Sequence, residues 1–580
     1  MRPHVMRRVL TTLALVAALV AAPAALPVTF DTGQHPRCRP GDNFTCRDLI
    51  IESFDGTAID ATVYLPAAGP APAVLMTHGY SGWHRGGGDF NSQRFLAENG
   101  YVVLAYTSRG FGRSQGTVEL DSPDFEVKDA QALIGWLADP SNTAGAVVLD
   151  GPDDPRVGMA GGSYAGGIQL LTAAYDARVD AIAPEITWND LRYSLAPNGV
   201  IKHGWIDLLY ASGKYGGYFG PPGTMPPPVA GTDGVSLDQD RQVALTYLAN
   251  DNVELPAGQT YSDGSRSTYE YLAKRSPLRD GVIDRIRADT LLIQGQKDTL
   301  FNVNEAVANF RAISDNRPKT STKLVIFSGG HGYGDLPGER DQIRSRILTW
   351  FARHLRGEKV RTGPPVEIWQ PWEAGTNFVG LRALPSRLTE FGVTPTSVRL
   401  ANTPAPTSHS EVSNFQSETS SSSRDAAPGL TSADLALEVP PGTAFAGSPV
   451  LRFTISSSAP EAIVFAKLHD LDSASGQRTH LLRLVTPVRV RSGKGDFCSD
   501  PIPGPSSTSA VSAAQVCLPL SGLTWRVQEG HRLVLTLATS DSMFLGSRIS
   551  AEYEITNLSL ELPVLTDNLA FRNRGRGRGL

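Results

Sequence analysis

The chain has 580 residues, of which 41% are hydrophobic and 19% charged, and its formal net charge is −5. This length exceeds one ordinary domain, so we expect two or three domains of ordinary globular composition. A small net charge on so long a chain argues against a nucleic-acid or membrane-surface partner.

The N-terminus has the features of a secretory signal. Arg2, Arg7 and Arg8 precede the apolar run VLTTLALVAALVAA, which meets an A-x-A-type cleavage site at Ala22-Pro23-Ala24. A transmembrane anchor is the alternative, but the run is short, and no later segment has the length and apolarity of a membrane span. We therefore expect residues 1–24 to be a cleaved signal peptide and the mature protein to be secreted.

The four cysteines form two close pairs in the sequence, Cys38 with Cys46 and Cys498 with Cys517. Disulfides persist in oxidising compartments, so the local pairing is favoured among the three possible connectivities. The long segment between the two pairs holds the candidate chemistry and contains no cysteine. No cluster of His, Cys and carboxylate residues has metal-ligand spacing, so we expect neither a metal nor another cofactor.

The N-terminal half predicts an α/β domain with a parallel sheet. IIESFDGTAIDATVYLP has hairpin chemistry at Asp55-Gly56. The buried-strand patterns that follow are APAVLMTHGY, YVVLAYTS, VGMAGG, AIAPEIT, TLLIQGQ and KLVIFSG. FEVKDAQALIGWLAD and DQIRSRILTWFARHLRG have helical periodicity, and strands separated by helix-length segments indicate βαβ units.

Residues 188–285 interrupt this alternation with helix-like pieces, a Pro/Gly-rich loop and many aromatic residues. An insertion next to the strand and helix around Ser163 is where a lid over an active site would lie. The alternative is a packing subdomain without a part in substrate choice.

From about residue 362 the pattern changes to β-branched strands and turns. The strand patterns are VEIWQPW, PVLRFTISSS, AIVFAKLHDL, HLLRLVTPVRV, HRLVLTLATS and ISAEYEITNLSLEL. Their spacing predicts a β-sandwich or jelly roll. Within it, residues 402–435 are rich in Ser, Thr, Ala and Pro and predict a long exposed loop.

These patterns divide the chain into seven segments. The predicted segments are 1–24 (signal peptide), 25–47 (N-terminal extension), 48–187 and 286–361 (the two parts of the α/β core), 188–285 (a mainly helical cap), 362–565 (jelly-roll domain) and 566–580 (a disordered Arg/Gly tail).

Val157 to Gly167, VGMAGGSYAGG, matches a nucleophile elbow, in which a strand turns sharply into a helix around a lone Ser. The strained turn needs small neighbours, because bulk at Gly161 or Gly166 would crowd the adjoining strand and helix. The pattern departs from G-x-S-x-G, since Ala165 takes the place of the second Gly. Ser163 is the candidate nucleophile.

Two further residues complete a candidate catalytic triad. Acyl transfer by Ser needs a base and a carboxylate that orients the base, and in an α/β-hydrolase these follow in the order Ser, acid, His. Asp298 follows the strand TLLIQG, and His331 follows the strand KLVIFS. The weaker alternatives have positions in the strand series that do not fit. They are Asp335, Glu305 and Asp289 as the acid, and His78 as the base.

The oxyanion of the tetrahedral intermediate needs N–H or O–H donors. The residue after the nucleophile, Tyr164, is expected to supply its backbone N–H, and Tyr80, in the loop after APAVLMTH, its phenol O–H or backbone N–H.

Six short motifs follow one another along the chain in this order: HGYSGW, TSRGFGRSQG, EVKDAQALIGWL, GGSYAGG, GQKDTLF and GGHGY. In this the chain resembles the X-Pro dipeptidyl-peptidase and cocaine-esterase (CocE/NonD) family of serine hydrolases, over roughly residues 48–565. The resemblance implies an α/β-hydrolase fold with a helical cap and a C-terminal jelly roll. It also implies Ser163, Asp298 and His331 as the triad, and Tyr80 with Tyr164 at the oxyanion hole. The family's acidic residue before R-G-x-G is Thr107 or Ser108 here, so we expect its ion pair to be missing.

The family contains X-Pro dipeptidyl-peptidases, esterases and β-lactam acylases, so the triad alone does not identify the substrate. A dipeptidyl-peptidase must bind an α-amine, and Glu185 and Asp190 are candidate carboxylates for that role. An esterase needs no such charge, and Trp83, Trp188 or Trp205 are candidate apolar walls for its pocket.

We therefore expect an exported serine hydrolase of the X-Pro dipeptidyl-peptidase type that acts on a small peptide. The alternative is an esterase or acylase that acts on a small ester. A third reading, from another class, is a non-catalytic protein whose β-domain binds cell wall or carbohydrate, although few aromatic residues besides Trp525 are available for a sugar platform.

Overall fold

The computed structural model describes residues 38–39, 41–85, 87–214, 239–317, 320–331, 335–373, 375, 377–402, 431–492 and 509–566. The expected signal peptide, Cys498 and most of the expected Arg/Gly tail lie outside these residues, as do residues 403–430 of the expected exposed loop. No helix among the described residues has the length and apolarity needed to cross a membrane.

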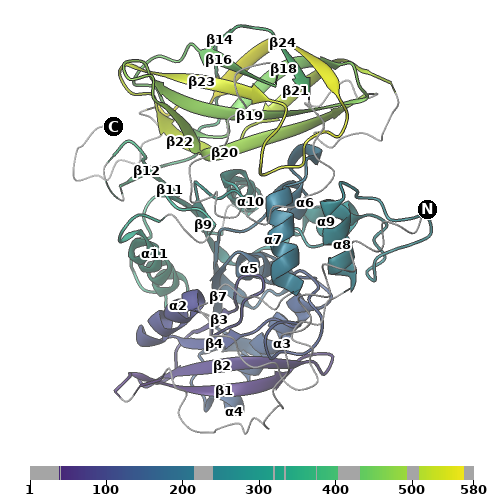
Figure 1. Cartoon of the computed structure of the whole chain (residues 1–580). Helices are drawn as coiled ribbons and strands as arrows, with labels where there is room; N and C mark the ends of the chain where they lie inside the picture. Colours follow the sequence, from purple (N-terminus) through teal and green to yellow (C-terminus); the bar gives the residue numbers. More distant parts are fainter. Residues whose placement is uncertain are drawn as a thin grey trace, which may run out of the picture.

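The N-terminal half forms one ten-stranded mixed sheet, in the order β1-β2-β4-β3-β7-β8-β9-β10-β11-β12 (Figure 1). Its strands are β1 (Phe44–Glu52), β2 (Ala58–Pro66), β3 (Ala73–Met76), β4 (Val102–Tyr106), β7 (Val157–Gly162), β8 (Val179–Glu185), β9 (Asp289–Gly295), β10 (Thr322–Phe327), β11 (Val366–Trp369) and β12 (Phe378–Leu381). Pairing is parallel from β4 to β11 and antiparallel at both edges. The predicted α/β fold is confirmed.

Helices cover both faces of this sheet. They are α2 (Gly87–Glu98), α3 (Glu126–Ala138), α4 (Pro140–Thr143), α5 (Tyr164–Tyr175), α10 (Val303–Asn316) and α11 (Glu339–His354). One hydrophobic core joins the sheet to α3, α5 and α10, and a second joins it to α2 and α11. Neighbouring strand residues belong to different cores, as Leu75 and Val74 do, so the central strands are apolar throughout.

The first two strands form the predicted hairpin. β1 and β2 pair antiparallel from Phe44 opposite Pro66 to Glu52 opposite Ala58, around the turn at Asp55-Gly56. A disulfide joins Cys38 to Cys46 in β1, which confirms that pairing. Cys517 is also disulfide-bonded.

Arg109, which follows Thr107 and Ser108, forms ion pairs with carboxylates from elsewhere in the chain. Its guanidinium contacts both carboxylate oxygens of buried Asp129 at 2.6 Å and reaches Asp55 at 3.1 and 3.3 Å. The carboxylates come from α3 and from the hairpin turn, so a compensating partner far along the chain was not visible in the local motif.

The segment between β8 and β9 is mainly helical where it is described. Its helices are α6 (Leu191–Leu195), η1 (Pro197–Gly199), α7 (His203–Lys214), α8 (Gln239–Ala249), α9 (Thr268–Ala273), η2 (Arg279–Gly281) and η3 (Ile283–Arg285). Helices α6 to α9 share a hydrophobic cluster with Tyr164 and Phe301 of the α/β part, and Ile201 accepts a backbone hydrogen bond from Leu545 (3.0 Å). A lid role for this segment stays a prediction.

The C-terminal region contains two five-stranded antiparallel sheets, drawn in green and yellow at the top of Figure 1. The first contains β13 (Thr389–Phe391), β15 (Val398–Asn402), β18 (Val450–Ser457), β21 (Val511–Pro519) and β24 (Ala551–Leu562). The second contains β14 (Val393–Thr394), β16 (Ser432–Leu437), β19 (Glu461–Asp472), β20 (Arg478–Arg491) and β23 (His531–Ala538). One core joins both sheets, and β17 (Ala444–Gly447) pairs with β22 (Leu523–Arg526) beside them. The jelly-roll topology stays a prediction.

One strand was predicted in the wrong sheet. VEIWQPW was expected in the β-domain, but β11 pairs in parallel with β10, and its Val366 and Ile368 are buried in the core of the α/β part. Alternating apolar residues predict a strand without stating which sheet it joins.

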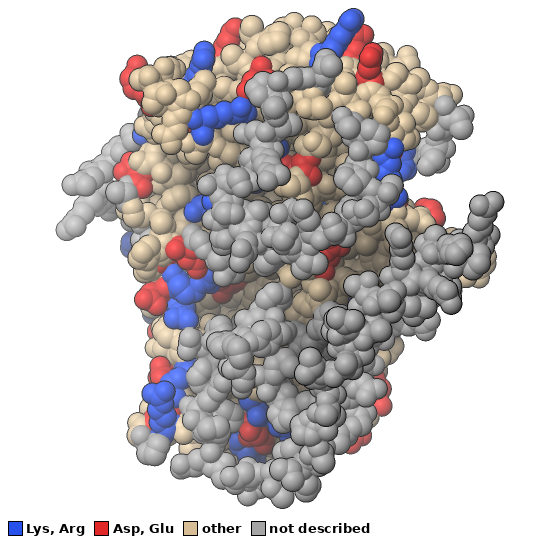
Figure 2. Space-filling model, viewed as in Figure 1, with Lys and Arg blue, Asp and Glu red and all other residues tan. Residues whose placement is uncertain are grey.

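On the face shown in Figure 2, acidic and basic side chains of the described residues are interspersed.

Candidate active site

Ser163 lies in a sharp turn between the end of β7 and the start of α5. Its φ of 59° and ψ of −121° are unusual for a residue with a side chain. A Cβ at Gly161 would lie 2.7 Å from the Cβ of Ala165, and one at Gly166 would lie 2.7 Å from the Cβ of Thr187. Side chains at these two positions would clash, as the elbow pattern predicted.

The structure brings the three expected triad residues together. Ser163 Oγ lies 2.9 Å from His331 Nε2, and His331 Nδ1 lies 3.0 Å from Asp298 Oδ2. Asp298 is fully buried after β9, and its Oδ1 accepts the N–H groups of Leu300 and Phe301, both at 2.9 Å. With Nδ1 donating to this carboxylate, Nε2 is the nitrogen that accepts the Ser163 hydroxyl proton.

Two aromatic rings hold the imidazole of His331 in place. The Trp205 and Phe301 ring centroids lie 5.4 and 5.2 Å from it, both in edge-to-face contact. Trp205 comes from α7 and donates its indole N–H to Thr299 Oγ1 at 3.1 Å. Phe301 was missed by the sequence analysis as a site residue, although it stands in the quoted GQKDTLF motif.

The alternative carboxylates are engaged elsewhere. Asp335 pairs with Arg340 at 2.8 Å, and Asp289 pairs with His354 at 2.5 Å. Glu305 is buried and accepts two backbone N–H groups just before α6.

His78 is buried in the loop after β3 and holds this loop by hydrogen bonds. Its Nδ1 lies 2.8 Å from the carbonyl oxygen of Gly79, and its Nε2 accepts the N–H of Ser108 at 3.1 Å. Burial lowers the pKa of His78 to about 4, so the ring is neutral near pH 7. This geometry agrees with the loop-bracing role that its position in the sequence indicated.

The two expected oxyanion donors lie beside the nucleophile. Tyr164 is the first residue of α5, so its N–H is among the donors that a helix leaves without an internal partner. Tyr80 lines the same cavity as Ser163, and its ring contacts those of Phe111 and Tyr164 at 5.5 and 5.9 Å.

Two buried acidic residues form hydrogen bonds with the phenol of Tyr164. The Tyr164 phenol donates to Glu126 Oε1 (3.1 Å) and accepts the N–H of Asp121 (3.2 Å). Both acids are fully buried, and burial raises the pKa of Glu126 to about 7. The sequence analysis missed them; for Glu126 the signal was its place on the same helical face as apolar Ala130 and Leu133, four and seven residues further on.

Ser163 opens into a small cavity of about 50 Å³. The other lining residues are Tyr80, Leu120, Tyr164, Trp188, Leu191, Leu195, Leu209, Leu245, Leu300 and Phe301. No charged side chain belongs to this lining as far as the structure is described. The leucines were missed because five segments far apart in the sequence supply them.

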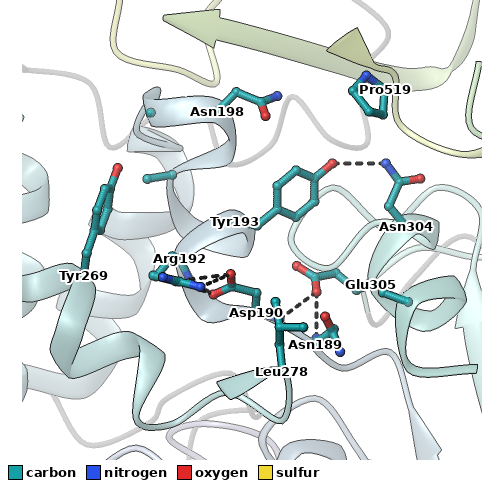
Figure 3. A pocket seen from close by; sticks show the side chains of 13 residues that line it. Asn189, Asp190, Arg192, Tyr193, Asn198, Tyr269, Leu278, Asn304, Glu305 and Pro519 are labelled. Carbon is teal, nitrogen blue, oxygen red and sulfur yellow. Dashed lines mark hydrogen bonds and ion pairs between the residues drawn. The ribbon is translucent and has the colours of Figure 1, made fainter. Parts of the chain in front are cut away.

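Glu185 and Asp190, the expected amine-binding carboxylates, do not line this cavity. Glu185 pairs with Arg340 at 2.6 Å. Asp190 caps α6, pairs with Arg192 at 2.8 Å and faces a separate cavity of about 390 Å³ (Figure 3). Each carboxylate therefore already has an arginine partner.

The three candidate tryptophans have different positions. Trp188 lines the Ser163 cavity and donates its indole N–H to the Arg275 carbonyl at 2.9 Å. Trp205 contacts His331, as described above. Trp83 is half-buried against His84 and Arg85 and is absent from the lining. Within the described ranges no group of three or more His, Cys, Asp or Glu residues is arranged to hold a metal ion.

The α/β part of the chain matches a known protein family. Residues 55–333 match the model of the X-Pro dipeptidyl-peptidase (S15) family. The quorum-quenching protein AidA of Acinetobacter baumannii is 30% identical over 201 residues, 34% of this chain and 62% of that protein. An uncharacterized 31.7 kDa protein of Escherichia coli is 27% identical over 119 residues, 20% of this chain and 38% of that protein. The matches thus span less than two thirds of either relative.

Solved structures resemble nearly the whole chain. An aminopeptidase from a marine sediment Thaumarchaeota archaeon has a TM-score of 0.67 at 14% identity and covers 94% of this chain and 99% of its own. An α-amino acid ester hydrolase has a TM-score of 0.67 at 16% identity, with 94% and 100% covered. A CocE/NonD family hydrolase from Staphylococcus aureus has a TM-score of 0.62 at 14% identity, with 90% and 94% covered. At such identities the likeness shows a shared fold.

Proposed function

We propose, from the premise that this chain is a hydrolase of the X-Pro dipeptidyl-peptidase (S15) and CocE/NonD family, that it is an exported serine hydrolase. The observation that carries the proposal is the hydrogen-bonded series from Ser163 through His331 to Asp298 at an apolar cavity. That series has the geometry required of nucleophile, base and orienting acid.

The reaction follows from these contacts. His331 Nε2 takes the proton as Ser163 Oγ attacks the substrate carbonyl, and buried Asp298 stabilises the imidazolium that forms. The Tyr164 N–H and the Tyr80 donor stabilise the oxyanion. His331 then protonates the leaving group, and a water molecule deprotonated by the same nitrogen hydrolyses the acyl-enzyme.

The cavity supports a short apolar acyl group without a charged amine. Its walls are leucine and aromatic side chains, and its volume of about 50 Å³ is small. A protonated α-amine would need a carboxylate there, while Glu185 and Asp190 are paired with arginines outside the lining. A carboxylic ester or acyl derivative is therefore the substrate class that the geometry favours.

X-Pro dipeptidyl-peptidase activity is the second candidate, and the family match itself favours it. Export is supported by the Cys38–Cys46 disulfide together with the signal-like N-terminus.

Three chromogenic substrates separate these activities: a free-amine X-Pro anilide, its N-acetylated form and a short-chain nitrophenyl ester. We expect turnover of the ester and little cleavage of either anilide. Cleavage of the free-amine anilide alone would instead establish the dipeptidyl-peptidase. The control is Ser163→Ala; turnover equal to that of the wild type would contradict the triad. Failure of the wild type to turn over any of the three substrates would favour a non-catalytic role.

A further inference from the structure

A second concave site lies in the β region, where ends of its strands meet the loop between β11 and β12. This cavity of about 370 Å³ is lined by Pro371, Trp372, Asp470, Asp472, Gln477, Thr479, Trp525, Arg526, Gln528 and His531. It shares no lining residue with the Ser163 cavity. Its volume is within the range of small-molecule sites.

Trp525 is held in a fixed orientation at this site. Its indole N–H donates to Asp470 Oδ2 at 2.8 Å, and the other oxygen of Asp470 lies 2.7 Å from His531 Nδ1. Asp470 is buried, whereas the side chain of His531 is 32% exposed. An aromatic wall positioned in advance in this way loses little conformational entropy when a ligand binds.

Trp372 and Arg526 also belong to the lining. The Arg526 guanidinium carbon lies 5.0 Å from the centroid of the Trp372 ring. Within the described part of the chain, Trp372 Nε1 and Arg526 Nε are buried donors without a hydrogen-bond partner. Buried donors are ordinarily satisfied, so this wall is suited to a ligand rich in acceptor oxygens.

The rim carries groups that both donate and accept hydrogen bonds. Gln477, Thr479 and Gln528 are exposed and offer two amides and one hydroxyl. The lining carboxylates already have hydrogen-bond partners. Asp470 contacts Trp525 and His531, and Asp472 accepts the N–H of Ala474 at 2.9 Å and the hydroxyl of Ser475. A cationic ligand would gain little from carboxylates that are engaged in this way.

We propose that the cavity formed by Trp372, Trp525 and their polar neighbours binds a neutral oligosaccharide. A sugar ring presents an apolar C–H face that packs on an indole, and its hydroxyl groups donate and accept at the same time. The lining offers both features: two indoles and a rim of mixed donors and acceptors. Bound glycan would hold the hydrolase on a polysaccharide surface without entering the Ser163 cavity.

The test is calorimetric titration of the mature protein with cellohexaose, xylohexaose, mannohexaose and maltohexaose, with hexagalacturonate as the charged comparison. We expect saturable binding of at least one neutral hexasaccharide. Trp525→Ala should weaken it about tenfold or more, because a central Trp commonly dominates a binding site. Ester hydrolysis should stay at the wild-type rate, so a failure here is distinguishable from a failure of the proposed function.

Two further variants keep the test decisive. Phe54→Ala removes an exposed aromatic side chain outside the cavity, 47% exposed at the β1–β2 turn, and should leave sugar binding unchanged. The double substitution of Gln477 and Gln528 by Ala alters only exposed side chains and should weaken binding about threefold or more, even if Trp525→Ala does not fold. Absence of binding to all four neutral sugars, equal binding by Trp525→Ala, or binding of hexagalacturonate alone would overturn the proposal.

Discussion

Two cavities of this protein contain an Asp–His pair, yet their surroundings differ. Asp298 and His331 are 3.0 Å apart, and Asp470 and His531 are 2.7 Å apart. Beside His331 the elbow places a serine hydroxyl at 2.9 Å, whereas His531 has no hydroxyl hydrogen-bonded to it among the described residues. The pair alone is therefore no catalyst, because a positioned nucleophile is also required.

The residues that line the two cavities also differ in polarity. Leucines and aromatic rings surround Ser163, and an apolar surrounding of low dielectric strengthens electrostatic interactions with a developing oxyanion. Amides, carboxylates and an arginine surround Trp525, where hydrogen bonds to a polar ligand are available instead. The first cavity is suited to bond cleavage and the second to binding.

The largest expected effect separates the two cavities completely. Ser163→Ala should lower kcat for ester hydrolysis by about 10⁴–10⁶-fold, because no other group can form the acyl-enzyme. Binding of a neutral hexasaccharide should remain at the wild-type affinity. Ester turnover and calorimetry on the same preparation measure both quantities, and a loss of both would mean that the cavities are not independent.

Equivalent substitutions in the two Asp–His pairs compare them directly. Asp298→Asn should lower kcat by about 10⁴-fold, since the amide no longer fixes the tautomer of His331 that accepts the serine proton. Asp470→Asn should leave kcat within about threefold of the wild type and weaken sugar binding, because the indole of Trp525 loses its carboxylate acceptor. Equal losses of kcat in both variants would contradict the assignment of roles.

Local patterns predicted the residues of the active site better than its walls. The elbow around Ser163 and the ends of β9 and β10 each depend on a short stretch, so the order of the motifs was enough to select Asp298 and His331. Leu209 and Leu245 reach the cavity from separate helices of the insertion, and no local pattern indicates where such helices pack. The same reason explains why VEIWQPW was recognised as a strand but assigned to the wrong sheet.

A smaller effect is expected at the oxyanion. Tyr80→Phe should lower kcat by about 10²–10³-fold if the phenol O–H donates to the oxyanion, the usual cost of one lost donor. KM should change little, because the interaction strengthens only in the transition state. An unchanged kcat would assign the second donor to a backbone N–H instead.

The smallest expected effect concerns Glu126, which accepts a hydrogen bond from the phenol of Tyr164. Burial raises the pKa of Glu126 from 4.5 to about 7, so the folded protein holds this proton more tightly than the unfolded chain does. The stability that this proton provides is complete below pH 4.5 and is lost as the pH rises through 7. Glu126→Gln removes the titration, so the fall in unfolding free energy between pH 5 and 7 should be shallower by up to about 1.4 kcal/mol per pH unit.

Denaturant unfolding at several pH values measures this slope for both proteins. The variant is expected to be less stable at pH 5, because the Gln amide nitrogen cannot accept a hydrogen bond, as Oε2 of Glu126 does from the Ser122 N–H at 2.9 Å. That loss shifts the whole curve without changing its slope. Parallel curves would mean that Glu126 does not titrate in this range.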